Sequence, residues 1–132
     1  MKTLMTILFA SLVLPSCVTY ERPPHEGFFL GEREVSFNGQ NDRITLGRYD
    51  GAFRAVQFVV RDNSVELYQM VIVFGNGERQ FIETRMVFGE RSRSGIIRLE
   101  GGKRHIVAIE FAYRTVGSWK NGRAVIQLFG LR

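Results

Sequence analysis

The chain has 132 residues, of which 45% are hydrophobic and 23% are charged, and its formal net charge is +5 at pH 7. This apolar share excludes an intrinsically disordered protein, and the length fits a single folded domain. A single cysteine excludes an internal disulfide framework, so the fold must be held by its own hydrophobic core.

The N-terminus predicts export. Lys2 is followed at residues 4–14 by eleven residues without a charge. A helix of that length covers about 16 Å, roughly half the hydrocarbon thickness of a bilayer. It is too short to span a membrane and is typical of the apolar region of a secretory signal. We therefore expect residues 1–16 to form a signal peptide.

The only cysteine predicts a lipid anchor. Leu14-Pro15-Ser16-Cys17 resembles a bacterial lipobox, in which the cysteine takes a diacylglycerol and becomes the new N-terminus. Pro15 departs from the small residue usual at its position. Val18 stands where an aspartate would resemble an inner-membrane retention signal, so we expect an exported lipoprotein of the outer membrane, facing the periplasm. The alternative is an ordinary secretory signal with an incidental cysteine.

The mature chain is expected to be basic. Without residues 1–16 it keeps 17 basic and 13 acidic residues, a formal charge of +4, and 15 of the cations are arginines. Such a surface favours phosphate, carboxylate or anionic lipid. Nucleic acid is not expected as a partner, because the signal directs the chain away from it.

The rest of the chain divides into a tether and one domain. Residues 17–27 contain two of the three prolines and no apolar period, which predicts an extended tether between lipid and domain. Residues 28–132 contain no proline and thirteen of the fourteen glycines. We expect this part to be a single domain.

The domain has the pattern of an all-β fold. Short Val-, Ile- and Phe-rich stretches alternate or run continuously, and no helical period is found. The expected strands are Phe29–Phe37, Arg43–Gly47, Phe53–Arg61, Val65–Phe74, Gln80–Phe88, Gly95–Leu99, His105–Thr115 and Ala124–Gly130. Asn-Gly pairs at residues 38–39, 76–77 and 121–122 mark tight turns.

About eight strands at this spacing predict a single antiparallel β-sandwich, jelly-roll-like in topology, because an open sheet would leave too much apolar surface in water. The strand alternation also predicts a buried core. Its expected members are Val56, Phe58, Val60, Val71, Val73, Ile109, Phe111, Val125 and Leu128.

Several strand and turn motifs resemble a known family. They are Phe29-Leu30-Gly31, Asp42-Arg43-Ile44, Gly51-x-Phe53-Arg54, Val73-Phe74-Gly75-Asn76-Gly77 and Ile97-x-Leu99-x-Gly101-Gly102-x-Arg104. They are similar to a group of small exported bacterial β-sandwich proteins catalogued as a domain of unknown function. The resemblance covers nearly all of residues 28–130 and implies the fold and the export, but no catalytic residue.

Enzyme chemistry is not indicated. No nucleophile elbow, zinc-binding helix motif or P-loop is present, and the glycine-rich stretches lie between strands. His105, beside an apolar strand, is more typical of a half-buried strand residue than of a base. Only three aspartates follow residue 27, too few to favour a calcium site. We expect no catalytic residue, cofactor or metal.

Two candidate ligand sites follow from the arginines and the tryptophan. Arg91, Arg93, Arg98 and Arg104 are close in sequence and could hold an anionic head group. The alternative is a solvated loop whose charge keeps strand edges apart. Trp119 could stack on a sugar ring, or it could close one end of the sandwich.

A weak internal repeat suggests two structural ion pairs. Residues 48–54 resemble residues 98–104, and each segment has an acid four residues before an arginine. The expected pairs are Asp50–Arg54 and Glu100–Arg104, with the Arg54 stem along the inner face.

The leading interpretation is a non-enzymatic, lipid-anchored module of the cell envelope that binds another envelope protein or has a structural role. The alternative is an anionic-ligand or glycan-binding domain that uses the Arg91–Arg104 region or Trp119.

Overall fold

The described fold consists of strands and one short 3-10 helix. The structure, a computed structural model, describes residues 27–47 and 51–132. The strands are β1 (Gly27–Val35), β2 (Gln40–Thr45), β3 (Ala52–Phe53), β4 (Ala55–Arg61), β5 (Val65–Phe74), β6 (Arg79–Phe88), β7 (Ile97–Arg98), β8 (Arg104–Thr115) and β9 (Ala124–Leu131). The 3-10 helix η2 (Trp119–Asn121) lies between β8 and β9.

Several predictions concern residues outside these two ranges. The expected signal peptide, Cys17, nearly all of the tether and Asp50 lie outside the described residues. Among the residues that are described, none belongs to a helix long and apolar enough to cross a membrane.

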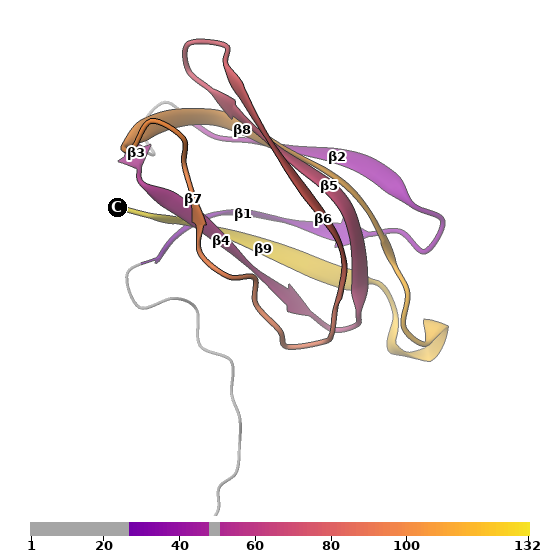
Figure 1. The fold of residues 1–132 in the computed structure, drawn as a ribbon. Coiled ribbons are helices and arrows are strands. Elements are labelled where there is room, and N and C mark those ends of the chain that lie inside the picture. The colour runs from indigo at the N-terminus through magenta and orange to yellow at the C-terminus, as the bar shows by residue number, and fades with distance from the viewer. Residues whose placement is uncertain (1–26, 48–50) are drawn as a thin grey trace, which may run out of the picture.

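The strands form two antiparallel sheets that face each other (Figure 1). One has the order β1-β9-β4-β7, and the other has the order β2-β8-β5-β6, with β3 added to β8. If β3 is left aside, the pairs are nested, because the first strand pairs with the last, the second with the next to last, and so on inward. This is the connectivity of a jelly roll, and it confirms the predicted fold.

The predicted strand Phe53–Arg61 is split in two at Arg54. β3 pairs with β8 in one sheet and β4 pairs with β9 in the other, so the chain crosses between the sheets here. The Phe53 ring fills the core against Gly130, at a point where a side chain on β9 would collide with it. Arg54 is exposed, and the prediction that its stem runs along the inner face is wrong because the crossing changes the alternation.

The hydrophobic core lies between the sheets and draws residues from both. Eight of the nine residues expected to be buried are buried: Val56, Phe58, Val60, Val71, Val73, Ile109, Phe111 and Leu128. Val125 is only half-buried, because β9 turns its even-numbered neighbours Ala124 and Ile126 inward.

A register irregularity in β5 decides which side chains face outward. Pairing with β8 shifts between Leu67 and Gln69, where β5 holds one more residue than β8. The alternation therefore changes phase. Leu67 and then Met70 face the core, whereas Val71 and its neighbour Val73 form a second buried cluster with Ala108 on the other face. The outer face of this sheet consequently has an apolar floor.

The Asn-Gly pair of the β5–β6 turn shows why that sequence was a reliable turn signal. Gly77 has φ +91°, a conformation that glycine adopts without strain. The Asn76 side chain accepts a hydrogen bond from the Glu78 backbone N–H (3.0 Å), and the Phe74 N–H donates to the Glu78 carbonyl (2.9 Å). The hairpin is thereby fixed.

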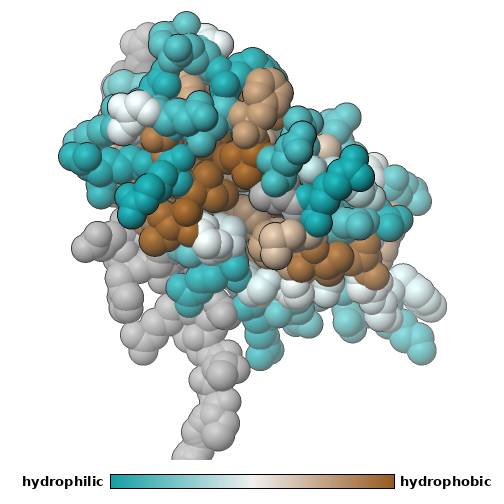
Figure 2. Space-filling view, viewed as in Figure 1, coloured by the Kyte–Doolittle hydropathy of each residue, from teal (hydrophilic) through white to brown (hydrophobic). Residues whose placement is uncertain are grey.

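The face turned to the viewer in Figure 2 is largely hydrophilic, but hydrophobic residues are exposed across the region where Figure 1 draws β6 and β7. These two strands are the last in their sheets, and the Gln80 side chain of β6 donates to the Arg98 carbonyl of β7 (3.0 Å).

Candidate functional site

The outer face of the β2-β8-β5-β6 sheet carries a row of four directly opposed residues. Arg43 on β2 is opposite Glu110 on β8, Glu110 is opposite Val71 on β5, and Val71 is opposite Phe81 on β6. The row thus runs from a charged pair to an aromatic ring. The ring is 60% exposed, although it belongs to a large apolar side chain.

Glu110 is the centre of an ion-pair chain across this face. Its Oε2 lies 2.6 Å from Arg43 Nη1, and its Oε1 lies 2.5 Å from Arg79 Nη2. Partial burial by itself would raise the pKa of the Glu110 carboxyl, but the hydrogen bonds from Arg79 and Arg43 outweigh it and lower that pKa. The carboxylate therefore remains ionised, and both guanidinium groups are held in place. Arg79 also lies 5.8 Å from the centre of the Phe81 ring.

Next to these ion pairs, the outer face of the sheet has a hollow. The hollow has a volume of about 390 Å³ and opens to solvent. Its lining combines amides, one carboxylate, guanidinium groups and an aromatic ring, from Asn41, Gln69, Glu110, Arg43, Arg79 and Phe81. Two guanidinium groups share one carboxylate there, so the hollow offers fixed hydrogen-bonding groups whose charges are mostly paired. Asp42 borders the hollow through β2, but its carboxylate is turned to the inner face, where it accepts from the buried Tyr113.

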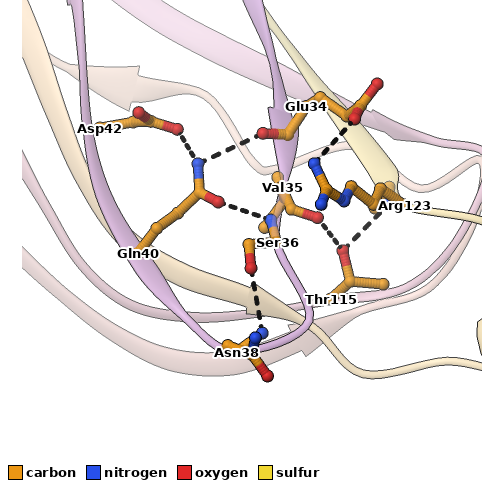
Figure 3. A network of polar contacts seen from close by, with 9 residues as sticks. Glu34, Val35, Ser36, Asn38, Gln40, Asp42, Thr115 and Arg123 are labelled. Carbon is orange, nitrogen blue, oxygen red and sulfur yellow. Dashed lines mark hydrogen bonds and ion pairs between the residues drawn. The ribbon is translucent and has the colours of Figure 1, made fainter.

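On the inner face of the sheet, the β2 wall behind the hollow is fixed by hydrogen bonds to Asp42. The Tyr113 hydroxyl donates to Asp42 Oδ2 (2.8 Å), and the Gln40 amide donates to the same oxygen. Burial, followed by the hydrogen bond to Asp42, raises the pKa of Tyr113 strongly, so this hydroxyl keeps its proton and stays a donor. Gln40 in turn accepts a hydrogen bond from the Ser36 backbone N–H (2.6 Å) and so ties Asp42 to the β1–β2 turn (Figure 3).

A buried threonine joins the two sheets beside this wall. Thr115 Oγ1 donates to the Val35 carbonyl (2.6 Å), as Figure 3 shows, and accepts from the Ala124 N–H (3.1 Å). Arg123 also reaches Glu34 across the adjacent strands (3.2 Å). The network holds β8, which carries Glu110, against β1 and β9.

The family of the chain is shown by a sequence comparison. Residues 4–130 match a family described as Domain of unknown function (DUF2541). The chain belongs to this family. The match extends over nearly the whole sequence and begins ahead of the strands, inside the expected signal peptide. Neither the curated proteins nor the solved structures include a match to the chain. Membership in DUF2541 therefore brings no activity and no site residues.

In this DUF2541 chain the four predicted arginines are spread out. The Arg91 N–H donates to the Val60 carbonyl, and Arg93 is opposite Val59, both towards the end of β4. Arg98 is opposite Ala55 at the start of the same strand. Four residues of strand, roughly 13 Å, separate these positions. The arginines do not converge on one site.

Arg104 belongs to a local structural cluster. Its guanidinium lies 3.7 Å from the centre of the Phe74 ring and pairs with the carboxylate of Glu78. Glu100 contributes its backbone carbonyl, which accepts a hydrogen bond from Nη1 (3.1 Å). The expected Glu100–Arg104 ion pair is replaced by a Glu78–Arg104 pair, because the β5–β6 turn brings Glu78 over the start of β8. The expected Asp50–Arg54 pair lies outside the described residues.

Trp119 is 75% exposed on η2. It does not close the end of the sandwich, because its loop is held instead by Asn63, whose amide donates to the carbonyls of Ser118 and Gly122 (2.8 Å each). Trp119 is not among the residues that line the hollow described above. It remains an exposed aromatic ring on a fixed loop.

The residues around the hollow were missed from the sequence because they come from different strands. Arg43 and Glu110 are 67 positions apart, and Arg79 and Glu110 are 31 apart. One signal was present, since Glu110 interrupts the apolar run from Ile106 to Ala112. Within residues 27–47 and 51–132, no three His, Cys, Asp or Glu side chains are grouped as metal ligands.

Proposed function

We propose that this domain is a non-enzymatic binding module of the bacterial cell envelope, and that the hollow beside Glu110 takes a neutral, polyhydroxylated ligand such as an oligosaccharide. The observation that carries the proposal is Glu110, held between Arg43 and Arg79 next to the exposed Phe81 ring.

The lining suits such a ligand chemically. A carboxylate oxygen that already accepts one hydrogen bond keeps a second lone pair, and a paired guanidinium keeps further N–H donors. These groups can bind adjacent hydroxyls of a sugar, as can the amides of Asn41 and Gln69. The Phe81 ring offers an apolar surface to the C–H face of the sugar. Pockets of this kind combine an apolar surface with a few fixed polar groups.

The same groups do not favour a strongly anionic ligand. In the hollow Arg43 and Arg79 are both paired with Glu110, and elsewhere Arg104 is paired with Glu78. The remaining arginines of the 91–104 region are spread along β4. An anion would therefore have to displace a carboxylate that is already paired.

We place this module outside the cytoplasm, attached by lipid at Cys17 to the outer membrane and facing the periplasm. The support is the apolar segment at residues 4–14 and the lipobox-like Leu14–Cys17. The family match begins at residue 4 and so takes in this segment. Residues 17–26 would then separate the domain from the membrane, and nucleic acid would not be a partner.

A ligand panel tests the proposal. The full chain, in a non-ionic detergent, would be heated with chitin, cellulose and maltose oligosaccharides, with inorganic polyphosphate, and with water-soluble anionic lipid head groups. We expect stabilisation by at least one oligosaccharide, because a ligand at about 100 times its Kd adds roughly 2.7 kcal/mol. Polyphosphate and the lipid head groups should have no such effect.

Two variants locate the binding. Phe81→Ala should weaken binding about tenfold, because it removes the apolar surface that stacks on a sugar. Trp119→Ala, the matched control, should leave the affinity unchanged. Stabilisation by polyphosphate alone, by no member of the panel, or lost only in Trp119→Ala would contradict the proposed site.

A further inference from the structure

β6 is a long edge strand whose outer side has no partner strand among the described residues. It ends the order β2-β8-β5-β6 and is ten residues long. Phe81, Met86 and Val87 on this strand are each more than half exposed. Figure 2 shows hydrophobic residues exposed in this region. A long edge that carries apolar side chains is a template for pairing with another strand.

The sequence of β6 is complementary to itself about one point. In Phe81-Ile82-Glu83-Thr84-Arg85-Met86-Val87, residues equally far from Thr84 match in kind. Glu83 corresponds to Arg85, and two apolar pairs flank them. If two copies of β6 lie antiparallel with Thr84 opposite Thr84, each Glu83 faces Arg85 of the second copy.

Phe81 and Val87 also lie on one face of the sheet. Phe81 is opposite Val71 and Val87 is opposite Glu66, and both of these partners belong to the outer face. In the register centred on Thr84, Phe81 would therefore contact Val87 of the second copy on that face. Cross-strand pairs of these kinds are the stabilising unit of antiparallel sheets.

The charges select this register over its neighbours. The register is defined by the residue of β6 that lies opposite itself in the second copy. Opposed side chains lie on the same face only if this two-fold point falls on a residue and not between two residues, so the nearest alternatives have it at Glu83 or at Arg85. The first sets Glu83 against Glu83, and the second sets Arg85 against Arg85. Like charges directly opposite each other are destabilising. Only the register centred on Thr84 makes both charged pairs attractive.

We propose that a second copy of this chain binds along β6 in this register and forms a two-fold symmetric dimer. Up to nine opposed residue pairs, from Gln80 to Phe88, would form, and they would exchange about eight backbone hydrogen bonds in a regular ladder. β6 holds one residue more than β5 between Glu83 and Met86, so the ladder would be bulged next to its centre. The two β2-β8-β5-β6 sheets would join into one continuous sheet. Because the interface is the same on both copies, the assembly closes at two chains.

Charge reversal tests the dimer. The full chain in a non-ionic detergent would be studied by sedimentation equilibrium without added ligand. The wild type should be dimeric. Glu83→Arg and Arg85→Glu should each weaken the dimer about tenfold or more, because each replaces two attractive pairs by two repulsive pairs. Glu32→Arg, the same charge change on β1, should leave the dimer constant unchanged.

Restoration by a second change separates the interface from misfolding. An equimolar mixture of Glu83→Arg and Arg85→Glu chains should form mixed dimers, since both charged pairs are then attractive again. The double variant should dimerise with itself. A wild type that stays monomeric, or that forms larger assemblies, overturns the proposal. So do single variants that dimerise normally, or a mixture and double variant that stay monomeric. None of these results depends on the ligand proposed for the hollow.

Discussion

Glu110 connects the middle of one sheet to both of its edges. It lies on β8, Arg43 lies on the edge strand β2, and Arg79 lies on the opposite edge strand β6, with β5 between. A single carboxylate therefore keeps two guanidinium groups on one face of the sheet. The arrangement combines three strands in a site that no single segment could supply.

Glu110→Gln should make the chain less stable by about 1 kcal/mol at neutral pH, because the two arginines lose their charged partner. The effect should depend on pH. The folded chain holds the pKa of Glu110 below its ordinary value, so its stabilising contribution is present above the ordinary carboxyl pKa and is lost as the pH falls through the lowered pKa.

Urea denaturation at neutral pH and at about pH 3 measures this difference. The difference in the free energy of unfolding between the wild type and Glu110→Gln should be smaller at the lower pH. Glu90→Gln, in an exposed loop, controls for the loss of one negative charge. If this difference in the free energy of unfolding is the same at both pH values, the stabilising role of the Glu110 ion pairs is contradicted.

At the scale of elements, two irregularities shape the fold. The extra residue in β5 turns Val71 and Val73 outward and gives the hollow its apolar floor. The crossing at Arg54 places the Phe53 ring in the core against Gly130 of β9. Both features change which side of a sheet the next residues face, and neither changes the overall topology.

Gly130→Ala should destabilise the chain by about 1–3 kcal/mol. A Cβ at this position would lie 2.6 Å from Phe53 Cδ1, on a ring that the core holds in place. Gly95→Ala is the control, because a Cβ there meets nothing within 4 Å. Urea denaturation of both variants measures the difference.

Phe53→Leu in the Gly130→Ala background should recover part of the loss, since the smaller side chain leaves room for the new methyl group. Equal stabilities for Gly130→Ala and Gly95→Ala would show that the ring can move aside.

At the scale of the whole molecule, nested pairing places the start and the end of the domain together. Gly27 of β1 is opposite Leu131 of β9. The proposed lipid at Cys17 would thus attach the domain at the end where the described chain also finishes, and the hollow lies on the sheet that does not contain β1.

Cys17→Ala should abolish acylation and leave unprocessed precursor, because the lipid is attached to the cysteine sulfur. Labelling with a radioactive fatty acid, together with fractionation of the cell envelope, measures both effects. A variant that is cleaved normally and still partitions with the membrane would refute the lipid anchor.

The strands and the tight turns could be predicted because their signals are local, and the sandwich was inferred from the number and spacing of those strands. Alternation of period two and the Asn-Gly pairs lie within a few residues of the structure that they specify. Pairing partners are not local. Arg104 is 26 positions from Glu78 and four from Glu100, yet it pairs with the carboxylate of Glu78. The change of phase at Leu67 was equally invisible, because an extra residue in a strand leaves no mark in its composition.

The β1–β9 pair also has a mechanical consequence. β1 is bonded to β9 over eight residue pairs, and the tether would enter at Gly27, the first of them. Tension applied along β1 loads these hydrogen bonds together in shear, whereas tension across the strand breaks them one after another from Gly27. A ligand fixed to the cell wall and a lipid fixed to the membrane would pull on the domain from opposite sides. The direction of that pull decides whether the β1–β9 pair resists force with all its hydrogen bonds together or loses them one by one.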